Sequence, residues 1–198
     1  MDLTTVLLDL DGVVRHFDLA RVESVEERYG LSPGILHATA FESGLLERAI
    51  TGRIRRIDWV QEVGDRVGHP VAARECFADL GVVDATMLDV VEALRAQGVV
   101  VAVLTNGTDT IPAEMEALGL ESRFEVIFNS AEMGVAKPDR RVFEEVCCRL
   151  RVAPSEVFFT DDSASKLKGA VEIGMTARLF EGVEPFRRHL AEAGFRVD

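Results

Sequence analysis

The stretch VLLDLDGVV at residues 6–14 decides the fold of this chain, because a short apolar run leads directly into two aspartates and a glycine. An apolar run without alternation is typical of a strand covered on both faces, as in a parallel sheet. Ligands of open parallel sheets bind beyond the carboxyl ends of the strands, where Asp9 and Asp11 fall. Side chains alternate along a strand, so both carboxylates can point the same way, and Gly12 lets the chain turn out of the sheet. Two carboxylates this close repel each other unless a cation or a proton lies between them.

Two simpler interpretations of this stretch stay open on its own residues. It is compatible with an Asp-Gly turn whose aspartates are solvated, or with half of a calcium-binding loop. The calcium-binding loop fits less well, because it requires a third Asp or Asn before its glycine and a Glu further on. Apolar Val13 and Val14 follow Gly12 instead.

The composition indicates a globular protein with a substantial core. Of the 198 residues, 47% are hydrophobic and 28% are charged, which suits one domain of moderate size or one domain with a small insertion. The formal net charge is -12, so we expect neither nucleic acid nor an anionic membrane as a main partner, since both favour basic surfaces. An anionic substrate then needs a local positive group in its binding site.

The cysteines and the N-terminus bear on where the protein works. Cys76, Cys147 and Cys148 are an odd number without metal-ligand spacing, which predicts reduced thiols rather than a disulfide framework or a zinc site. The chain starts Met1-Asp2 and reaches the first strand at once, so we expect no signal peptide. No apolar run approaches the length of a membrane span. These features together predict a cytoplasmic location.

Residues 17–80 have a helical pattern and no second strong strand candidate. Apolar residues recur at helical spacing over 19–29, and further helices are expected at 35–41, 45–51 and 57–67. Breaks are expected at Gly30, around 32–34, and near Gly44, Gly52 and 68–70. This segment reads as a small helical insertion on a sheet domain.

From Met87 onward, helices and strands alternate. Helices are expected at 87–97, 111–118, 138–150, 164–173 and 185–193, and strands at 99–104, 126–128, 157–159 and, more weakly, 177–180. Strands that alternate with helices of about ten residues imply right-handed crossovers. The fold class is therefore predicted to be α/β, with a doubly wound parallel sheet.

Three of the predicted strands end in polar clusters. Asp9 and Asp11 follow the first strand, Thr105 and Asn106 the second, and Asp161 and Asp162 the fourth. Parallel strands present their carboxyl ends at one edge, so these groups can converge. Lys137, in a loop that opens a helix, could supply the missing positive charge.

This set of side chains suits phosphate chemistry with a hard metal ion. Carboxylates are ligands for magnesium, a hydroxyl and an amide suit phosphate oxygens, and an ammonium offsets negative charge. An aspartate nucleophile needs a partner acid that protonates the leaving oxygen and then activates water, and Asp11 is placed for that. Each motif alone has a simpler explanation: a strand-end turn at Thr105, a solvated Lys137, and a helix N-cap at 161–163. The combination and order of the motifs outweigh these explanations.

In this combination the chain resembles the haloacid dehalogenase superfamily of phosphohydrolases. DLDGV at residues 9–13 is similar to the first motif of that family, Thr105-Asn106 to the second, Lys137-Pro138 to the third, and DDS at 161–163 to the fourth. Gly169-Ala170 and Gly174-Met175 match the usual continuation. The resemblance implies a Rossmann-like core of residues 1–16 and 81–198, with residues 17–80 inserted as a helical cap domain.

The resemblance also implies a role for each motif residue. Asp9 would be the nucleophile that becomes an aspartyl phosphate, and Asp11 the general acid and base. Magnesium would be held by the Asp9 carboxylate, the Asp11 backbone carbonyl and Asp162, with Asp161 reaching it through water. The phosphoryl group would be held by three residues: Thr105, Asn106 and Lys137.

Two positions separate this chain from parts of the family it resembles. Members that dehalogenate haloacids lack the acid at the Asp11 position and need no magnesium, so phosphoryl transfer is favoured over dehalogenation. Relatives with Asp-Asp-Ser usually carry Asn or Asp three residues after the serine, where this chain has Lys166. A cation there would perturb the metal site or occupy part of it, or else point to solvent.

The sequence thus predicts a cytoplasmic, magnesium-dependent phosphatase that acts on small phosphorylated metabolites, as a monomer or a homodimer. The alternatives are a sugar phosphomutase, which shares every motif, and a binding or regulatory protein with little turnover. Substrate choice is expected to lie in the cap, because the core recognises only phosphate. The candidates for substrate contacts are Arg15, His16, Phe17, Phe41, Glu42, Arg53, Arg55, Arg56 and Trp59.

Overall fold

A parallel β-sheet forms the centre of the computed structural model, which describes residues 3–197. The strands are β1 (Thr5–Leu8), β4 (Val100–Thr105), β5 (Ile127–Asn129), β6 (Val157–Asp161) and β7 (Thr176–Leu179). They pair in the order β5-β4-β1-β6-β7, with every pairing parallel. The predicted α/β class and parallel sheet are confirmed. Residues 1, 2 and 198 belong to the predicted core domain (1–16 and 81–198) and lie outside the described residues.

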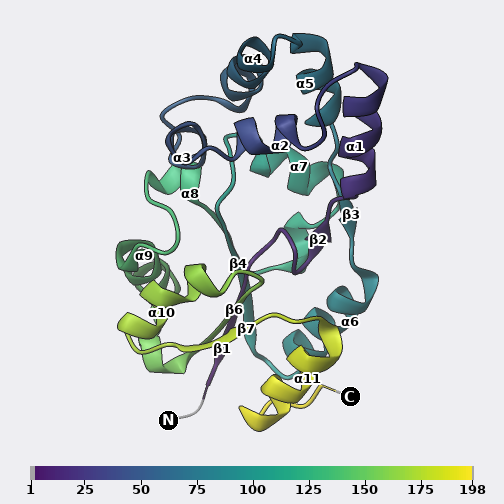
Figure 1. The fold of residues 1–198 in the computed structure, drawn as a ribbon. Helices are drawn as coiled ribbons and strands as arrows, with labels where there is room; N and C mark the ends of the chain where they lie inside the picture. Colours follow the sequence, from purple (N-terminus) through teal and green to yellow (C-terminus); the bar gives the residue numbers. More distant parts are fainter. Residues whose placement is uncertain (1–2, 198) are drawn as a thin grey trace.

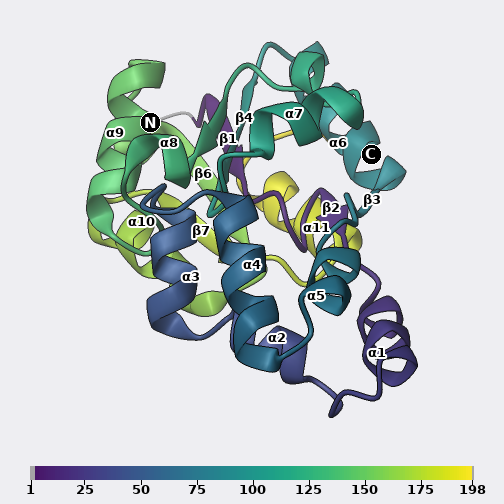
Figure 2. The ribbon, with the colours of Figure 1, turned by 90° about the horizontal axis from the view of Figure 1, so that it is seen from above.

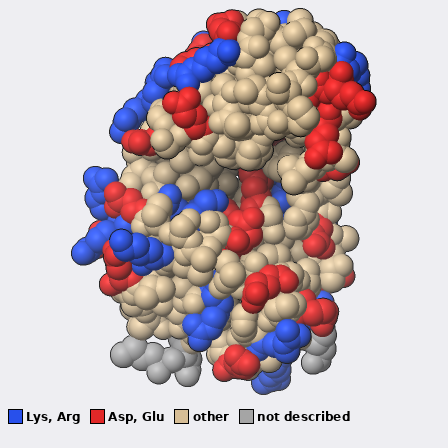
Figure 3. Space-filling view, viewed as in Figure 1, with Lys and Arg blue, Asp and Glu red and all other residues tan. Residues whose placement is uncertain are grey.

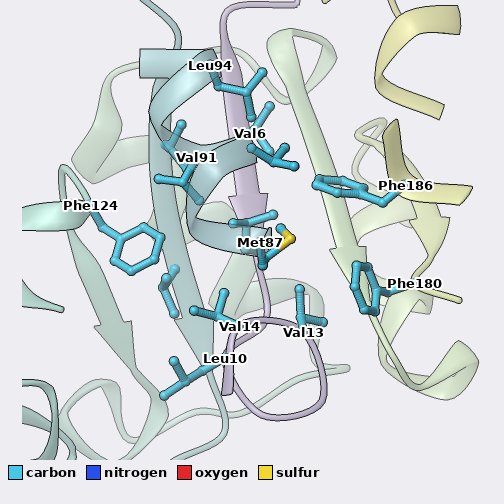
Figure 4. Packing of buried hydrophobic residues seen from close by; sticks show 14 of the residues in the cluster. Val6, Leu10, Val13, Val14, Met87, Val91, Leu94, Phe124, Phe180 and Phe186 are labelled. Atoms are coloured by element: carbon cyan, nitrogen blue, oxygen red, sulfur yellow. The ribbon is translucent and has the colours of Figure 1, made fainter. Parts of the chain in front are cut away.

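One face of the sheet is covered by α6 (Ala85–Ala96), α7 (Ile111–Ala117) and α11 (Val183–Glu192). Figure 4 shows Val6 of β1 among Met87 and Leu94 of α6 and Phe186 of α11. Val13 and Val14, which follow the two aspartates, are also fully buried in this cluster. Their burial holds the loop after β1 against the sheet.

The opposite face is covered by α9 (Arg140–Leu150) and α10 (Lys168–Glu172). Leu7 and Phe159 point to this side, whereas their neighbours Val6 and Phe158 point to the other. The strands β1, β4 and β6 therefore have apolar side chains on both faces, which explains the unbroken apolar runs in the sequence. A short helix, α8 (Ser130–Met133), directly follows β5.

Five helices form a layer above the carboxyl ends of the strands (Figures 1 and 2). They are α1 (Leu19–Arg28), α2 (Ile35–Ala40), α3 (Ser43–Ile50), α4 (Arg56–Val67) and α5 (Pro70–Cys76), here called the cap helices. They share a hydrophobic cluster of their own, which includes Leu36, Trp59 and Val63. The division into two domains at 16/17 and 80/81 stays a prediction.

A two-stranded antiparallel ribbon joins the cap helices to the core. It pairs β2 (Arg15–His16) with β3 (Val82–Val83). Strands of two residues are too short to show an alternating pattern, so this ribbon could not be predicted from the sequence. It brings the two chain segments that lead into and out of the cap helices side by side.

Some predicted boundaries differ from the structure. The break expected near Gly44 lies at residues 41 and 42, between α2 and α3, so α3 begins at Ser43 and includes Gly44 in its first turn. The helix predicted at 138–150 begins at Arg140, with the Asp139 side chain as its N-cap. The helix predicted at 164–173 is a 3-10 turn, Ala164–Leu167, followed by α10. Within residues 3–197, no helix is both long enough and apolar enough to cross a membrane.

Replacing Phe186 by alanine should lower the free energy of unfolding by about 3–5 kcal/mol, because it leaves a cavity in the core. The Phe186 ring is 1% exposed and lies 6.1 Å from the Phe158 ring and 5.8 Å from the Phe180 ring, centroid to centroid. Urea denaturation measures this loss. Val171→Ala on α10, where Val171 is 59% exposed, should change stability by less than about 0.5 kcal/mol. Equal losses in the two variants would contradict the assignment of Phe186 to the core.

Candidate active site

The loop after β1 fixes the first aspartate at the sheet edge. The Asp9 backbone N–H donates to the Thr160 carbonyl at 2.9 Å, which continues the β1–β6 pairing by one residue. The Asp9 side chain is 2% exposed, and its Oδ1 accepts a hydrogen bond from the Leu10 N–H at 2.8 Å. Burial raises the pKa of the Asp9 carboxyl, and the nearby Lys137 ammonium opposes this rise.

Gly12 is required by the close approach of two loops. Its φ is +88°, in the region that favours glycine, and a Cβ atom there would lie 2.2 Å from Oδ2 of Asp162. No side chain can replace the glycine hydrogen without moving the Asp162 carboxylate. The glycine therefore brings the loops after β1 and β6 together.

Lys137 connects two strand ends through its ammonium group. Its Nζ lies 2.7 Å from Asp9 Oδ1 and 2.6 Å from Asp161 Oδ2, with the lysine side chain 0% exposed. The same Nζ lies 5.6 Å from the centroid of the Phe159 ring. The structure thus brings Lys137 to both aspartates, and it pairs Asp161 directly with the lysine.

The Asn106 side chain holds the Lys137 loop in place. Its Nδ2 donates to the Lys137 carbonyl at 2.9 Å, and its Oδ1 accepts from the Lys137 N–H at 2.9 Å. Asn106 therefore fixes the backbone that presents the ammonium. Thr105 is 1% exposed at the end of β4 and makes no side-chain hydrogen bond to these groups within residues 3–197.

Three carboxylates fit a divalent cation. Oxygens of Asp9, Asp161 and Asp162 all lie within 4.8 Å of one another. Asp9 Oδ2 is buried and accepts no hydrogen bond from any group in the described part of the chain. A buried oxygen without a partner is costly, and hard oxygen donors of this kind suit magnesium. The residues present can therefore hold this ion.

Lys166 lies beside the same carboxylates. Its Nζ is 3.8 Å from Asp9 Oδ2 and 4.0 Å from Asp161 Oδ1, and its side chain is 31% exposed. Burial alone would lower the pKa of Lys166, but the Asp9 and Asp161 carboxylates outweigh it and raise the pKa. Lys166 therefore points toward these carboxylates rather than to solvent.

Arg15 holds the second aspartate of the motif. Its Nε lies 2.6 Å from Asp11 Oδ1 and its Nη2 3.2 Å from Asp11 Oδ2, and its Nη1 donates to Glu114 Oε2 at 2.6 Å. The Arg15 side chain is only 2% exposed. Such a two-point contact fixes the plane of the Asp11 carboxylate.

Asp11 faces a cavity that is open to solvent on one side. The Asp11 side chain is 41% exposed, and it lines the space between the cap helices and the core. Desolvation in this space raises the pKa of the Asp11 carboxyl, and Arg15 offsets part of the rise. A raised pKa favours the protonated form that a general acid needs.

The cap candidates divide into two groups. Arg15, Phe17, Phe41, Arg56 and Trp59 line the cavity beside Asp11. The other four do not line it and contact charged residues at the surface instead. Glu42, Arg53 and Arg55 form ion pairs with Arg66, Glu47 and Asp58, and His16 Nε2 lies 3.5 Å from Asp84 Oδ2.

Glu114 is a site residue that sequence reasoning missed. It accepts hydrogen bonds from Arg15 and from the Thr110 hydroxyl, which lies 2.6 Å from Oε1. Burial alone would raise the pKa of Glu114, but these two donors and the charges of Arg15 and Arg56 outweigh it and lower the pKa. The sequence signal that could have indicated Glu114 was Arg15, a basic residue that directly follows an apolar run and needs an acidic partner. Which acidic residue pairs with Arg15 is decided by tertiary packing.

Glu114→Gln should lower the free energy of unfolding by roughly 1.5–3 kcal/mol at neutral pH, because it weakens the hydrogen bond from the buried Arg15. Glu114 has a lowered pKa in the folded state, so it stabilises above its ordinary value of 4.5, and this contribution is lost as the pH falls through the lowered pKa. The difference between the two proteins should therefore shrink in acid, as measured by urea denaturation from pH 3.5 to 7.

Glu116→Gln is the matched control, because Glu116 lies exposed on the same helix. It should change stability by less than about 0.5 kcal/mol at every pH. A Glu114→Gln difference that is constant over this pH range would contradict the role given to the Glu114 charge.

Curated relatives with similar sequences include a phosphatase and a dehalogenase. The chain is 27% identical over 197 residues to phosphatase MT3486 of Mycobacterium tuberculosis, covering 91% of this chain and 88% of that protein. It is 28% identical over 148 residues to (S)-2-haloacid dehalogenase 4A of Burkholderia cepacia, covering 74% of this chain and 62% of that protein.

Among solved structures, HAD family enzyme bt-2542 of Bacteroides thetaiotaomicron has the same fold, with a TM-score of 0.79 at 23% identity over 96% of this chain and 99% of that one. A complex of that enzyme with magnesium and inorganic phosphate aligns with a TM-score of 0.74 at 25% identity, over 89% of this chain and 93% of that one. The family model of the haloacid dehalogenase-like hydrolases matches residues 3–174. Because this family model matches most of the chain, the chain belongs to the haloacid dehalogenase-like hydrolases.

Proposed function

We propose that this protein is a phosphatase that hydrolyses phosphate monoesters of small metabolites. The observation that carries the proposal is the environment of Asp9. This carboxylate is buried, one of its oxygens is held by Lys137 and by a backbone N–H, and the other accepts no hydrogen bond within residues 3–197. A carboxylate that is positioned but only partly satisfied is suited to attack an electrophile.

The balance of charge supports a metal-assisted site for an anion. Asp9, Asp161 and Asp162 carry three negative charges, and the neighbouring Lys137 and Lys166 carry two positive ones. A phosphate monoester therefore needs further positive charge to enter. Magnesium, held by Asp9, Asp161 and Asp162 together with the Asp11 carbonyl, would neutralise the phosphate oxygens.

In the proposed first step, a carboxylate oxygen of Asp9 attacks phosphorus and the bond to the ester oxygen breaks. Asp11 donates its proton to the leaving alkoxide, and an aspartyl phosphate remains on Asp9. Lys137 offsets charge on the transferred group, with Asn106 holding its loop and Thr105 at the adjacent strand end. In the second step, Asp11 takes a proton from water as the water attacks phosphorus, which releases inorganic phosphate and restores Asp9.

Asp11 also favours phosphate ester hydrolysis over dehalogenation. An alkoxide leaving group needs a proton, whereas a halide leaves without one. Asp11 has a raised pKa and is fixed by Arg15 at the edge of the cavity. A positioned acid of this kind assists the first reaction and not the second.

Asp9→Asn should abolish phosphate release from a panel of phosphorylated metabolites, by about a thousandfold or more, because the amide cannot form the covalent intermediate. Phosphate is measured at saturating magnesium, and chelation of the metal should stop the native enzyme as well. Asp89→Asn, at an exposed aspartate of α6, should retain full activity. Phosphate release that persists in Asp9→Asn would refute the assignment of the nucleophile.

Lys166→Asn should strengthen magnesium binding by roughly tenfold, because it removes a positive charge within 4.0 Å of two carboxylates of the site. Calorimetric titration of the protein with magnesium measures this change without requiring turnover. Lys168→Asn is the control, since that side chain is 75% exposed and pairs with Glu172; it should leave the affinity unchanged. Unchanged or weaker binding in Lys166→Asn would show that Lys166 does not oppose the metal.

A further inference from the structure

A cavity of about 290 Å³ lies between the cap helices and the core and reaches the proposed phosphate site. Asp11, Asn106 and Gly107 line its core side. Figure 3 shows a hollow between the cap helices and the core, with acidic and basic atoms beside it. In a phosphatase with Asp9 as nucleophile, the organic part of the substrate would extend into this space.

The cap side of the cavity is largely apolar. The apolar residues that line it are Phe17, Leu19, Val22, Phe41, Leu46, Ile50, Trp59, Cys76 and Phe77. Phe41 is 49% exposed and stacks on His37 with ring centroids 4.2 Å apart. The indole N–H of Trp59 donates to the Ala40 carbonyl at 3.2 Å, so its polar atom is already used within the cap helices. The cavity thus presents aromatic and aliphatic surface.

The cations that line the cavity are already paired. Arg15 binds Asp11 and Glu114. Arg56 donates to the Phe77 carbonyl at 2.7 Å and lies 3.9 Å from Glu114.

The third cation is Arg21 on α1, which lies 3.8 Å from Asp79. The remaining charged residue of the lining, Asp18, accepts a hydrogen bond from the Ala20 N–H at 2.9 Å. Every charged side chain that lines the cavity in the described part of the chain therefore has a partner. A second phosphate or a carboxylate on the substrate would therefore meet no cation in the lining that lacks an acidic neighbour.

We propose that the preferred substrate is the phosphate monoester of a compact, uncharged, apolar alcohol. This inference rests on the proposed phosphatase function. A cavity of about 290 Å³ suits a compact organic group rather than a long or branched one. On the cap side, the hydroxyl groups of a sugar would lose their water against aromatic and aliphatic side chains, which disfavours sugar phosphates.

Two esters of similar shape test this proposal. Cyclohexylmethyl phosphate and glucose 6-phosphate both have a six-membered ring with a phosphorylated primary carbon, and they differ in the ring oxygen and hydroxyls. With magnesium, kcat/KM for cyclohexylmethyl phosphate should be at least about tenfold higher. A kcat/KM for glucose 6-phosphate that is equal or higher would overturn the proposal.

Variants locate the effect in the cavity. Phe41→Ala should lower kcat/KM for cyclohexylmethyl phosphate roughly fivefold and leave that for glucose 6-phosphate unchanged. Ile57→Ala is the control, because Ile57 is 69% exposed on α4 and does not line the cavity; it should change neither value. A parallel loss for both esters in Phe41→Ala would contradict recognition of the apolar group by this residue.

Failure of the phosphatase function is distinguishable from failure of this inference. If the native protein releases phosphate from neither ester nor from any compound of the metabolite panel, the proposed function is wrong. Calorimetric binding of the two esters to the native protein with magnesium then tests the cavity by itself. Tighter binding of cyclohexylmethyl phosphate would support an apolar ligand, and equal binding would overturn it.

Discussion

The ion pairs of Lys137 with Asp9 and Asp161 are the interactions on which the rest of the site depends. The ammonium and both carboxylates are essentially removed from water. Removing one partner of such a buried group leaves an uncompensated charge, at a cost of roughly 3–5 kcal/mol. Only the folded sheet brings the loop that follows α8 to the ends of β1 and β6. The Lys137 ammonium therefore has two roles: it stabilises the packing of these loops at the sheet edge, and it offsets the negative charge of Asp9 and Asp161.

A second set of charges connects the cap helices to the same edge. Arg15 lies in β2, pairs with Val83 of β3, and reaches both Asp11 and Glu114. The ribbon that carries the chain into and out of the cap helices thus also orients the Asp11 carboxylate. Gly81 packs directly on the Arg15 side chain, because a Cβ atom at this position would lie only 2.9 Å from Arg15 Cγ. The glycine therefore leaves the space that the Arg15 side chain occupies.

Most of the architecture could be predicted from local pattern. The apolar runs at β1, β4 and β6 are buried on both faces, so their sequence is unbroken and easy to recognise. The ribbon β2–β3 and the 3-10 turn at Ala164–Leu167 were not predicted, because short segments carry too little periodicity. The break expected near Gly44 falls just before it, at residues 41 and 42, and α3 includes Gly44 because one glycine lowers helix stability by only about 1 kcal/mol, which packing can offset.

The sequence by itself determined which groups stand at the strand ends, because the order of strands and motifs along the chain dictates which side chains follow each strand. It thereby predicted a cluster of Asp9, Lys137, Asp161 and Asp162, and the structure brings these residues together. Only the tertiary structure decided the partners: Asn106 with the Lys137 backbone, and Arg15 with Glu114. The first pair is separated by 31 positions along the chain and the second by 99. Contacts over such separations depend on how the helices pack on the sheet, and no local sequence pattern encodes that packing.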